Sequence, residues 1–470
     1  MKDSITTNKM GIENIPSLML KMGIPIILSM MLQAAYNIVD SYFVSGMDKY
    51  VGIKGAGELG NTALTLAFPI QMLIVAISIG TGVGINALLS KSLGAKDTKK
   101  VSKIAGNAVS LGLIIYFVFF ILGILFINIY VKTQTGNEAV LSMTGSYLRI
   151  CTFLSFGIIM FGIYEKLLQS TGKTVLSTIA QISGAVANII LDPILIYGLC
   201  GLPAMGIRGA AYATVIGQIL SMAIAMAFQY SVNKREIPFH FSNMKPSLSI
   251  IKEIYAIGFP AIVMQALMSF MTYGVNIIFG RVSEGAVTAY GLFYKIQQFI
   301  FFAGFGLRDA ITPIVSFNHG MGNKKRVKDG IKYGIIYTEI IMFLGIIVLE
   351  IIAEPFIRVF DFSKGTATLA IYAMRIISLG FLFAGINISG QAIFQALECG
   401  SGSLIVSLLR LLIVPLPLAY IFTLTNNAKS LIWWAFPIGE FVAFIAAIII
   451  MKKIFRKNGL TKTATEEVFL

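Results

Sequence analysis

The sequence predicts an all-α polytopic membrane protein with 12 transmembrane helices in two six-helix lobes. Three observations lead to this fold class. The 470-residue chain is 56% hydrophobic and only 13% charged, with a mean hydropathy of +0.82, whereas charged residues make up about 25% of an ordinary soluble domain. About twelve stretches reach the roughly 20 mostly apolar residues that a helix needs to cross a bilayer. The second half of the chain also repeats landmarks of the first.

The apolar stretches are separated by clusters of charged residues, glycine or proline, which set their limits. We expect spanning helices at residues 16–43, 57–82, 105–129, 140–163, 174–198, 206–230, 251–279, 285–316, 331–352, 366–393, 401–425 and 431–451. The first stretch is too long for the hydrophobic region of a cleaved signal peptide and has no clear small-x-small cleavage site. We therefore expect it to be retained.

Four landmarks occur in the same order in both halves. GIPIILSMMLQ recurs as GFPAIVMQALM, and the basic turn LGAKDTKKV recurs as MGNKKRV. Two polar residues keep their spacing of 20 as well: Arg149 and Gln169 in the first half, Arg375 and Gln395 in the second. A repeat of six helices returns the chain to its starting side, so both halves are expected to share one orientation in the membrane.

This duplication divides the chain. We predict a six-helix lobe at 1–232, a cytoplasmic linker at 233–250, a second six-helix lobe at 251–452 and a cytoplasmic tail at 453–470. Secondary transporters use such paired bundles, which move against each other around a site near the middle of the bilayer. The alternative is a duplicated bundle with no transport pathway.

Lysine and arginine are distributed unequally between the two sides. With the N-terminus placed inside, about 24 basic residues lie on that side and about 8 on the other. Cytoplasmic loops are enriched in lysine and arginine, so this bias explains the net charge of +15 without a nucleic-acid partner. We expect a multi-pass protein of the inner (plasma) membrane with both termini in the cytoplasm.

Nothing in the sequence indicates an enzyme. The three cysteines, Cys151, Cys200 and Cys399, are isolated from one another, and the two histidines lie near loop ends. The chain lacks the H-E-x-x-H, G-x-S-x-G and P-loop spacings of common reaction centres. The glycines of GTGVGIN follow a helix, whereas a dinucleotide-binding loop follows a strand. We expect no cofactor and no use of ATP.

The first expected helix carries a polar stripe. Gln33, Asn37 and Asp40 are spaced by four and three residues, which places them on one face. An aspartate at the centre of a spanning helix costs about 2.5–3.5 kcal/mol by insertion scales, so such residues face the bundle interior. We expect Asp40 to do the same.

The fifth expected helix carries a second polar stripe, with Asn188 and Asp192 four residues apart and Gln181 two turns earlier. Gly184 on the same face is small enough to admit another helix closely. Helices 1 and 5 run in the same direction, and each aspartate lies near the C-terminal end of its helix. Both aspartates are therefore expected in the outer half of the membrane, at the level of Tyr147 and Thr214, which lie near the outer starts of helices 4 and 6.

Two close carboxylates in a poorly solvated place cannot both remain ionised. We therefore expect this site to bind protons, or a small hard cation such as Na⁺ through oxygen ligands. The alternative is that Asp192 caps a helix break at Pro193 and that Asp40 reaches the outer headgroup region. Part of the chain's methionine and phenylalanine is expected to line an apolar cavity, because thioethers and aromatic faces suit lipophilic or cationic ligands. Polar candidates for that cavity are Gln33, Tyr36, Asn37 and Gln181.

The remaining embedded charges are expected to form ion pairs that fix helix packing. They are Lys295, Arg308, Asp309, Arg149, Arg375, Arg410, Glu339 and Glu440. Glu165 lies beside Lys166 at the cytoplasmic end of helix 4, where we expect it to be solvated.

Six stretches together are similar to a known family: NIVDSYFVSG, GTGVGINALLSKSLGAKD, YEKLLQSTGKT, ANIILDPILI leading to GIRGAAYAT, PIVSFNHGMGNKKRV and PIGEFVAF. Through them the chain resembles the multidrug and toxic compound extrusion (MATE) family of antiporters, most closely its MepA-like bacterial branch. The resemblance covers about residues 20–452.

The resemblance implies a V-shaped pair of six-helix lobes that exports organic, often cationic, compounds while H⁺ or Na⁺ enters the cell. It implies a coupling-cation site at Asp40, Asn188 and Asp192, which Na⁺ would occupy through these three residues, with Tyr147 and Thr214 at further matching positions. The cation site that another branch builds on helices 7 and 10 is not expected, because helix 7 has no carboxylate beyond Glu253. We expect a monomer in contact with membrane lipid. The alternative is a lipid-linked or metabolite flippase of the same superfamily.

Overall fold

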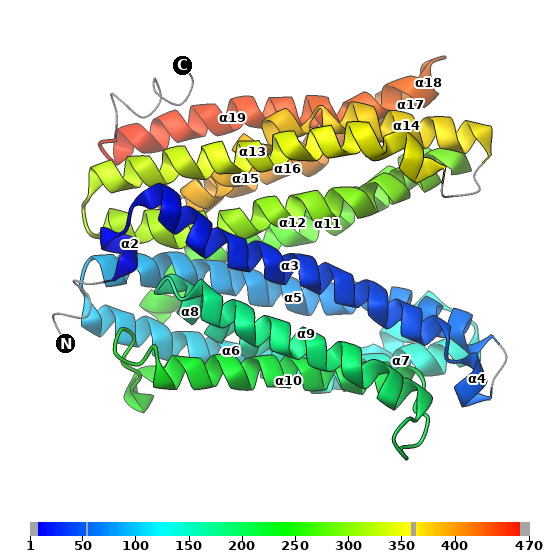
Figure 1. The fold of residues 1–470 in the computed structure, drawn as a ribbon, viewed down its shortest axis with the longest axis horizontal. Helices are drawn as coiled ribbons and strands as arrows, with labels where there is room; N and C mark the ends of the chain where they lie inside the picture. Colours follow the sequence, from blue (N-terminus) through cyan, green and yellow to red (C-terminus); the bar gives the residue numbers. More distant parts are fainter. Residues whose placement is uncertain (1–7, 53–54, 359–362, 461–470) are drawn as a thin grey trace. The chain divides into compact units, whose positions relative to one another are not determined.

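The structure is a computed structural model that describes residues 8–52, 55–358 and 363–460 (Figure 1). Within these ranges all regular structure is helical. Ten of the described helices are long and apolar enough to span a membrane, and the number is twelve if each of two bent helix pairs forms one span. The predicted all-α polytopic fold class is therefore confirmed.

The first half contains α2 (Lys9–Ile12), α3 (Ile15–Ser45), α4 (Asp48–Val51), α5 (Ala56–Gly94), α6 (Thr98–Gln134), α7 (Glu138–Phe153), α8 (Phe156–Ser170), α9 (Thr174–Tyr197), α10 (Ile207–Ser231) and the 3-10 turn η1 (Phe241–Met244). Helices α7 and α8 meet at a bend of 43° and together cover the span expected at 140–163.

The second half contains α11 (Leu248–Gly280), α12 (Glu284–Gly320), α13 (Lys324–Ile357), α14 (Lys364–Ser378), α15 (Phe381–Ala396), α16 (Gly400–Leu408), the π-helical turn η2 (Leu409–Ile413), α17 (Pro415–Thr423), α18 (Ala428–Leu431), the 3-10 turn η3 (Ile432–Trp434) and α19 (Ala435–Lys457). Helices α14 and α15 are bent by 52° and correspond to α7 and α8 of the first half.

Several helices are longer than the apolar stretches that predicted them. Helix α6 begins at Thr98, where the Asp97 side chain accepts a hydrogen bond from the backbone N–H of Lys100. Helix α13 begins in the same way, because Asn323 accepts from the N–H of Arg326. These side chains cap the exposed N–H groups of the first turn. These helix starts are thus set by capping residues beyond the apolar stretches, which hydropathy does not detect.

The described residues form two compact units. Unit 1 comprises Leu28–Ile254, and unit 2 comprises residues 8–27 together with 255–460. Each boundary falls inside a helix, α3 in one case and α11 in the other. The predicted limits of the two lobes stay a prediction.

The interiors of the two units differ in character. Unit 2 has an aromatic core, in which Phe279 and Trp433 meet edge to face at 5.1 Å between ring centroids and Tyr290 stacks on Phe436 at 5.4 Å. Unit 1 has a core of smaller aliphatic residues around Val44, Ala210 and their neighbours. Small side chains let helix backbones approach closely, and the polar residues of unit 1 lie among such contacts.

Asp48, the first residue of α4, bonds to the start of α5. Its carboxylate accepts hydrogen bonds from the N–H of Gly55 at 2.9 Å and of Gly57 at 2.5 Å. These two bonds hold the pKa of the Asp48 carboxyl below its ordinary value. A depressed pKa means that the bonded carboxylate stabilises the start of α5 above about pH 4, and that this contribution is lost as the pH falls through the folded-state pKa.

We expect the amide of Gly57 to be protected from hydrogen exchange at pH 7 and to lose protection as the pH falls through the folded-state pKa of Asp48, which lies below its ordinary value of about 4. Asp48→Asn should remove the protection at pH 7, since the neutral amide oxygen accepts more weakly than a carboxylate. Protection factors, corrected for the intrinsic exchange rate at each pH, would measure this. Glu58→Gln, at an exposed acid of the same helix start, is the matched control. Equal protection in the Asp48 and Glu58 variants would contradict the assignment.

Candidate functional site

Asp40, Asn188 and Asp192 come together inside unit 1. Asp40 lies five residues before the end of α3, and Asp192 lies five residues before the end of α9. The two helix ends are joined because the Tyr197 hydroxyl donates a hydrogen bond to the Phe43 carbonyl at 2.8 Å. Asp40, Asn188 and Asp192 are respectively 8%, 3% and 0% exposed. The carboxyl groups of the two aspartates lie close enough to interact electrostatically.

Oxygen atoms at this place lack hydrogen-bond donors. Asn188 Nδ2 donates to Asp192 Oδ1 and to Thr214 Oγ1, both at 3.4 Å. Oδ1 of Asp40, Oδ1 of Asn188 and Oδ2 of Asp192 are buried and accept no hydrogen bond from any described residue. A buried polar atom without a partner costs about 1–3 kcal/mol, and more when it is charged. The three oxygens therefore form an electron-rich site that a proton or a cation would stabilise.

Helices α7, α5 and α10 supply the neighbouring polar groups. Tyr147 on α7 is 2% exposed, and its hydroxyl accepts a hydrogen bond from Gln71 Nε2 of α5 at 3.2 Å. Tyr147 also lies within electrostatic range of Asp40. Gln71 was not expected from the sequence, although a lone amide within the apolar run of α5 is the signal that could have indicated it. The structure thus places all five predicted coupling residues in unit 1.

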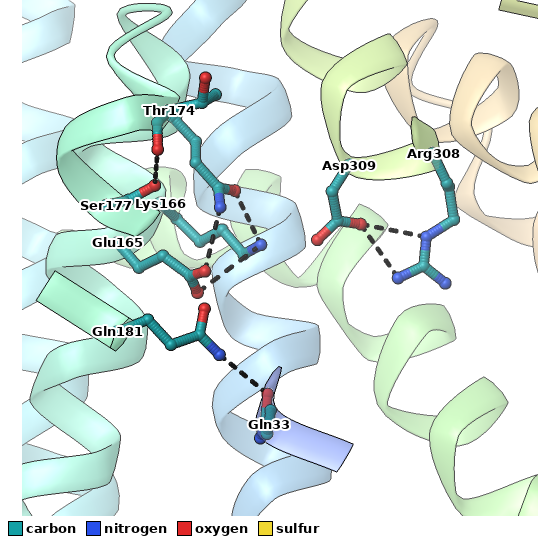
Figure 2. Close-up of polar contacts among 9 residues, drawn as sticks. Gln33, Glu165, Lys166, Thr174, Ser177, Gln181, Arg308 and Asp309 are labelled. Atoms are coloured by element: carbon teal, nitrogen blue, oxygen red, sulfur yellow. Dashed lines mark hydrogen bonds and ion pairs between the residues drawn. The ribbon is translucent and has the colours of Figure 1, made fainter. Parts of the chain in front are cut away.

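The predicted substrate-cavity residues are placed less completely. Gln181 on α9 donates a hydrogen bond from Nε2 to Gln33 Oε1 on α3 at 2.9 Å, as Figure 2 shows. Both side chains are half-buried, as is Tyr36. The side chain of Asn37 lies outside the part of the chain that is described. These four residues remain candidates.

The α9–α10 contact holds Asn188 against Thr214. A Cβ atom on Gly184 would lie 1.9 Å from Ser221 Oγ and 2.3 Å from the Gly217 carbonyl oxygen. The close helix approach expected at Gly184 is therefore present. Helix α9 continues through Pro193 to Tyr197. The alternative, in which Asp192 caps a helix break at Pro193, is therefore wrong.

The expectation that Glu165 is solvated is wrong. Glu165 belongs to a largely buried cluster on α8, in which its Oε1 accepts from Gln169 Nε2 at 3.0 Å (Figure 2). Lys166, only 4% exposed, donates to Gln169 Oε1 at 2.8 Å and has its Nζ 3.8 Å from Glu165 Oε2. Gly82 of α5 makes room, since a Cβ there would lie 2.8 Å from Lys166 Cγ. A buried ion pair is tolerated when hydrogen bonds satisfy both partners.

Most of the other embedded charges are paired. Arg410 and Glu440 approach to 2.6 Å in a largely buried contact, and Arg308 and Asp309 approach to 3.0 Å (Figure 2). Two more arginines bond to neighbours: Arg375 to Glu354 at 2.9 Å and Arg149 to Asn128 at 2.6 Å. The expected ion pairing is confirmed for Arg308, Arg375 and Arg410. Three residues differ: Arg149 bonds to the neutral side chain of Asn128, Lys295 is exposed, and Glu339 Oε1 is buried without a hydrogen-bond partner among the described residues.

Solved structures share this fold over nearly the whole chain. A structure described as the outward-facing conformation of a multidrug resistance MATE family transporter of the MOP superfamily matches with a TM-score of 0.86, at 23% sequence identity, over 97% of this chain and 98% of the other. A crystal structure of MATE in the straight conformation matches with a TM-score of 0.87, at 24% identity, over 97% and 99%. These matches establish the fold.

Sequence relatives lead to the same family. The multidrug export protein MepA of Staphylococcus haemolyticus is 25% identical over 450 residues, which cover 96% of each chain. MepA of Staphylococcus aureus is 24% identical over 433 residues and 92% of each chain. The MatE family model matches residues 25–194 and 260–421, one segment in each half, which is also where the internal repeat lies. Members of this family are transporters rather than enzymes. The chain belongs to the MatE family.

Proposed function

We propose that this protein is a secondary active multidrug efflux transporter, which exports lipophilic and cationic organic compounds in antiport with H⁺ or Na⁺. Membership of a transporter family and relatives named as multidrug export proteins support export. The observation that carries the antiport is the pair of buried carboxylates, Asp40 and Asp192. Neither forms an ion pair with a described lysine or arginine, so their charge is available to an incoming cation.

The coupling site consists of Asp40, Asn188 and Asp192, with Tyr147 and Thr214 beside them. Its donor atoms are all oxygens, which suit a proton or a hard cation such as Na⁺ rather than a transition metal. Two carboxylates and one amide oxygen carry at most two negative charges. A single bound cation therefore removes half of the site's charge.

Antiport requires that cation and drug affect each other's binding. With the site empty, the negative charge of Asp40 and Asp192 attracts a cationic drug held near Gln33, Tyr36, Asn37 and Gln181. Arrival of H⁺ or Na⁺ weakens that attraction, and in a poorly solvated place the change is large. The drug, now bound less tightly, leaves to the outside. This exchange requires that the cation and the drug each bind the inward-open and outward-open states with different affinity, because only such a difference shifts the equilibrium between the states.

The chain is a multi-pass membrane protein. We further propose that it lies in the inner (plasma) membrane as a monomer surrounded by lipid, with both termini in the cytoplasm. The threefold excess of basic residues on one side supports this orientation. The lobes at 1–232 and 251–452, with the linker 233–250 and the tail 453–470, belong to the same proposal.

Ethidium accumulation in inverted membrane vesicles tests the function. We expect accumulation when the vesicle lumen is made acidic or rich in Na⁺ relative to the outside, and the gradient that drives it identifies the coupling ion. Vesicles from cells without the protein are the control. No accumulation of ethidium or of several other cationic dyes under either gradient would contradict drug antiport and would favour a lipid-linked or metabolite flippase.

A further inference from the structure

The first residues of each half are packed in the compact unit formed mainly by the other half. We call residues 8–27 the first leading segment and residues 238–254 the second. The first belongs to unit 2 and the second to unit 1. Both continue into a long helix, α3 or α11, whose remainder belongs to the opposite unit. The exchange is therefore mutual and follows the internal repeat.

Arg326 and Asn318 hold the first leading segment. Arg326 Nη2 donates to the carbonyl oxygens of Met10 at 2.9 Å and of Glu13 at 2.7 Å. Asn318 Nδ2 donates to the same Met10 carbonyl at 2.9 Å, and its Oδ1 accepts from Arg326 Nε at 2.9 Å. We call these two side chains the clasp. Met10 and Asn318 are fully buried, so the bonds are shielded from water.

The carbonyls that the clasp binds lie at the C-terminal end of α2, since Met10 is within the helix and Glu13 is its C-cap. Helix α2 spans only Lys9–Ile12. The last four carbonyl oxygens of a helix receive no hydrogen bond from N–H groups of the same helix. A guanidinium near such a helix end is bound by charge-assisted hydrogen bonds, which are about twice as strong as neutral ones. The clasp thus ends α2 and attaches it to α12 and α13 at once.

Close packing continues along the first leading segment. A Cβ on Gly11 would lie 3.0 Å from Met321 Sδ, and a Cβ on Gly23 would lie 2.8 Å from the Leu307 side chain. Further along, Ile27 packs against Gly306 of α12, where a Cβ added to the glycine would lie 2.7 Å from the Ile27 side chain. The segment is therefore seated on α12 over its whole length and is more than a tethered end.

The second leading segment is held in an equivalent way on α6. Lys100 Nζ forms an ion pair with Glu253 Oε2 at 2.6 Å, and Ser102 Oγ donates to the Pro238 carbonyl at 2.7 Å. Asn107 Oδ1 accepts from the N–H of Ser247 at 2.7 Å. Lys100 and Arg326 lie 226 residues apart in the repeat, and each is the residue whose N–H is capped at the start of its helix. The same helical position thus carries the basic residue in both units.

We propose that Arg326 and Asn318 are positioning residues for transport, which keep the first leading segment docked on unit 2 throughout the cycle. Because α3 is one helix from Ile15 to Ser45, a segment fixed to unit 2 transmits the movement of that unit to Asp40 in unit 1. The clasp therefore links the carboxylate site to the movement of the opposite unit. This inference rests on the proposed antiport function.

Arg326→Gln tests the clasp, with Lys325→Gln as the matched control. Lys325 is an exposed neighbour in the same helical turn, so both variants remove one positive charge from the same place. We expect the maximal rate of ethidium export to fall roughly tenfold in Arg326→Gln, since the three charge-assisted hydrogen bonds of the guanidinium are lost. The equilibrium Kd for ethidium should change by less than about twofold, because the clasp bonds to the backbone of Met10 and Glu13, which are not among the proposed cavity residues. Lys325→Gln should match the unchanged protein in both measurements, and Arg326→Lys should recover part of the rate.

Equal export rates for Arg326→Gln and Lys325→Gln would overturn the proposal. A parallel loss of export, ethidium binding and thermal stability in Arg326→Gln would also overturn it, because the residue would then serve the fold alone.

A cross-link tests whether the segment stays docked. Gly11→Cys with Met321→Cys, in a background where the three native cysteines are replaced, places two thiols across the packed contact. We expect the oxidised protein to export ethidium at the rate of the reduced protein. Loss of export on oxidation and recovery on reduction would show that the segment must leave unit 2 and would overturn the proposal. The yield of the cross-link can be measured whether or not the protein exports dye. If the unchanged protein moves no dye, the proposed function fails. Equal cross-linking yields with and without an ion gradient would still support a docked segment.

Discussion

Export of ethidium driven by an ion gradient is expected to collapse in Asp40→Asn and in Asp192→Asn, while both proteins still insert into the membrane. An asparagine cannot release a proton at any physiological pH, and its neutral oxygen holds Na⁺ less strongly than a carboxylate does. The loss should be at least about tenfold, the factor that corresponds to one charge-assisted contact of about 1.5–3 kcal/mol. The measurement is the initial rate of dye movement in vesicles, normalised to the amount of folded protein.

The structure predicts that these two variants fold. Neither aspartate has an ion-pair partner among the described residues, so the substitution leaves no opposite charge buried alone, which is the usual cause of a large loss of stability. Glu58→Gln, at an exposed acid on α5, is the control for a change of carboxylate to amide elsewhere in unit 1. Because the two aspartates act on one bound cation, the double variant should be no worse than either single one. Undiminished export by both single variants would contradict the coupling site.

Gly184→Ala is expected to lower the free energy of unfolding by about 1–3 kcal/mol, the range for overpacking a well-filled interior. Its new methyl group would meet the Gly217 carbonyl oxygen at 2.3 Å. That oxygen belongs to the backbone of α10 and cannot rotate away, so the two helices must separate. Export should fall as well, because Asn188 lies one turn further along α9 and bonds to Thr214 of α10.

Gly291→Ala provides the matched control for this prediction. Gly291 lies within α12, and an added Cβ there meets no other atom within 4 Å. Replacing glycine by alanine in an open helical position stabilises the helix by about 0.5–1 kcal/mol. Thermal or denaturant unfolding should therefore shift in opposite directions for the two variants. A Gly184→Ala protein as stable as the unchanged one would show that α9 and α10 are less tightly packed than the structure indicates.

The membrane helices were predictable because hydropathy is a local property. The stretch expected at 174–198 corresponds to α9, Thr174–Tyr197, which ends at Gly198 in the left-handed conformation with φ of 74°. The stretch at 57–82 fell short of α5, which continues to Gly94. Polar residues such as Asn86 and Ser90 occupy that part of α5 and are buried, so their environment comes from neighbouring helices rather than from lipid.

Burial of charge was the property that local reasoning missed. Lys166 next to Glu165 has the pattern of a solvated helix end, yet both side chains are largely covered. Gly82, 84 residues earlier in the chain, provides the space for Lys166. A pattern of neighbouring residues cannot report which distant glycine lies opposite, because that depends on the register between α5 and α8.

Residue composition and spacing were sufficient for the polytopic helical class, the internal repeat and the polar faces of α3 and α9, since each depends on the order of residues within one segment. The tertiary structure alone decided which side chains meet. It brought Asp40 near Asp192 across 152 positions, left one oxygen each of Asp40, Asn188 and Asp192 without a donor among the described residues, and packed residues 8–27 in the unit formed mainly by the second half. Such contacts arise from helix packing and the exchange of segments between units, and these depend on complementary shapes that are far apart in the chain.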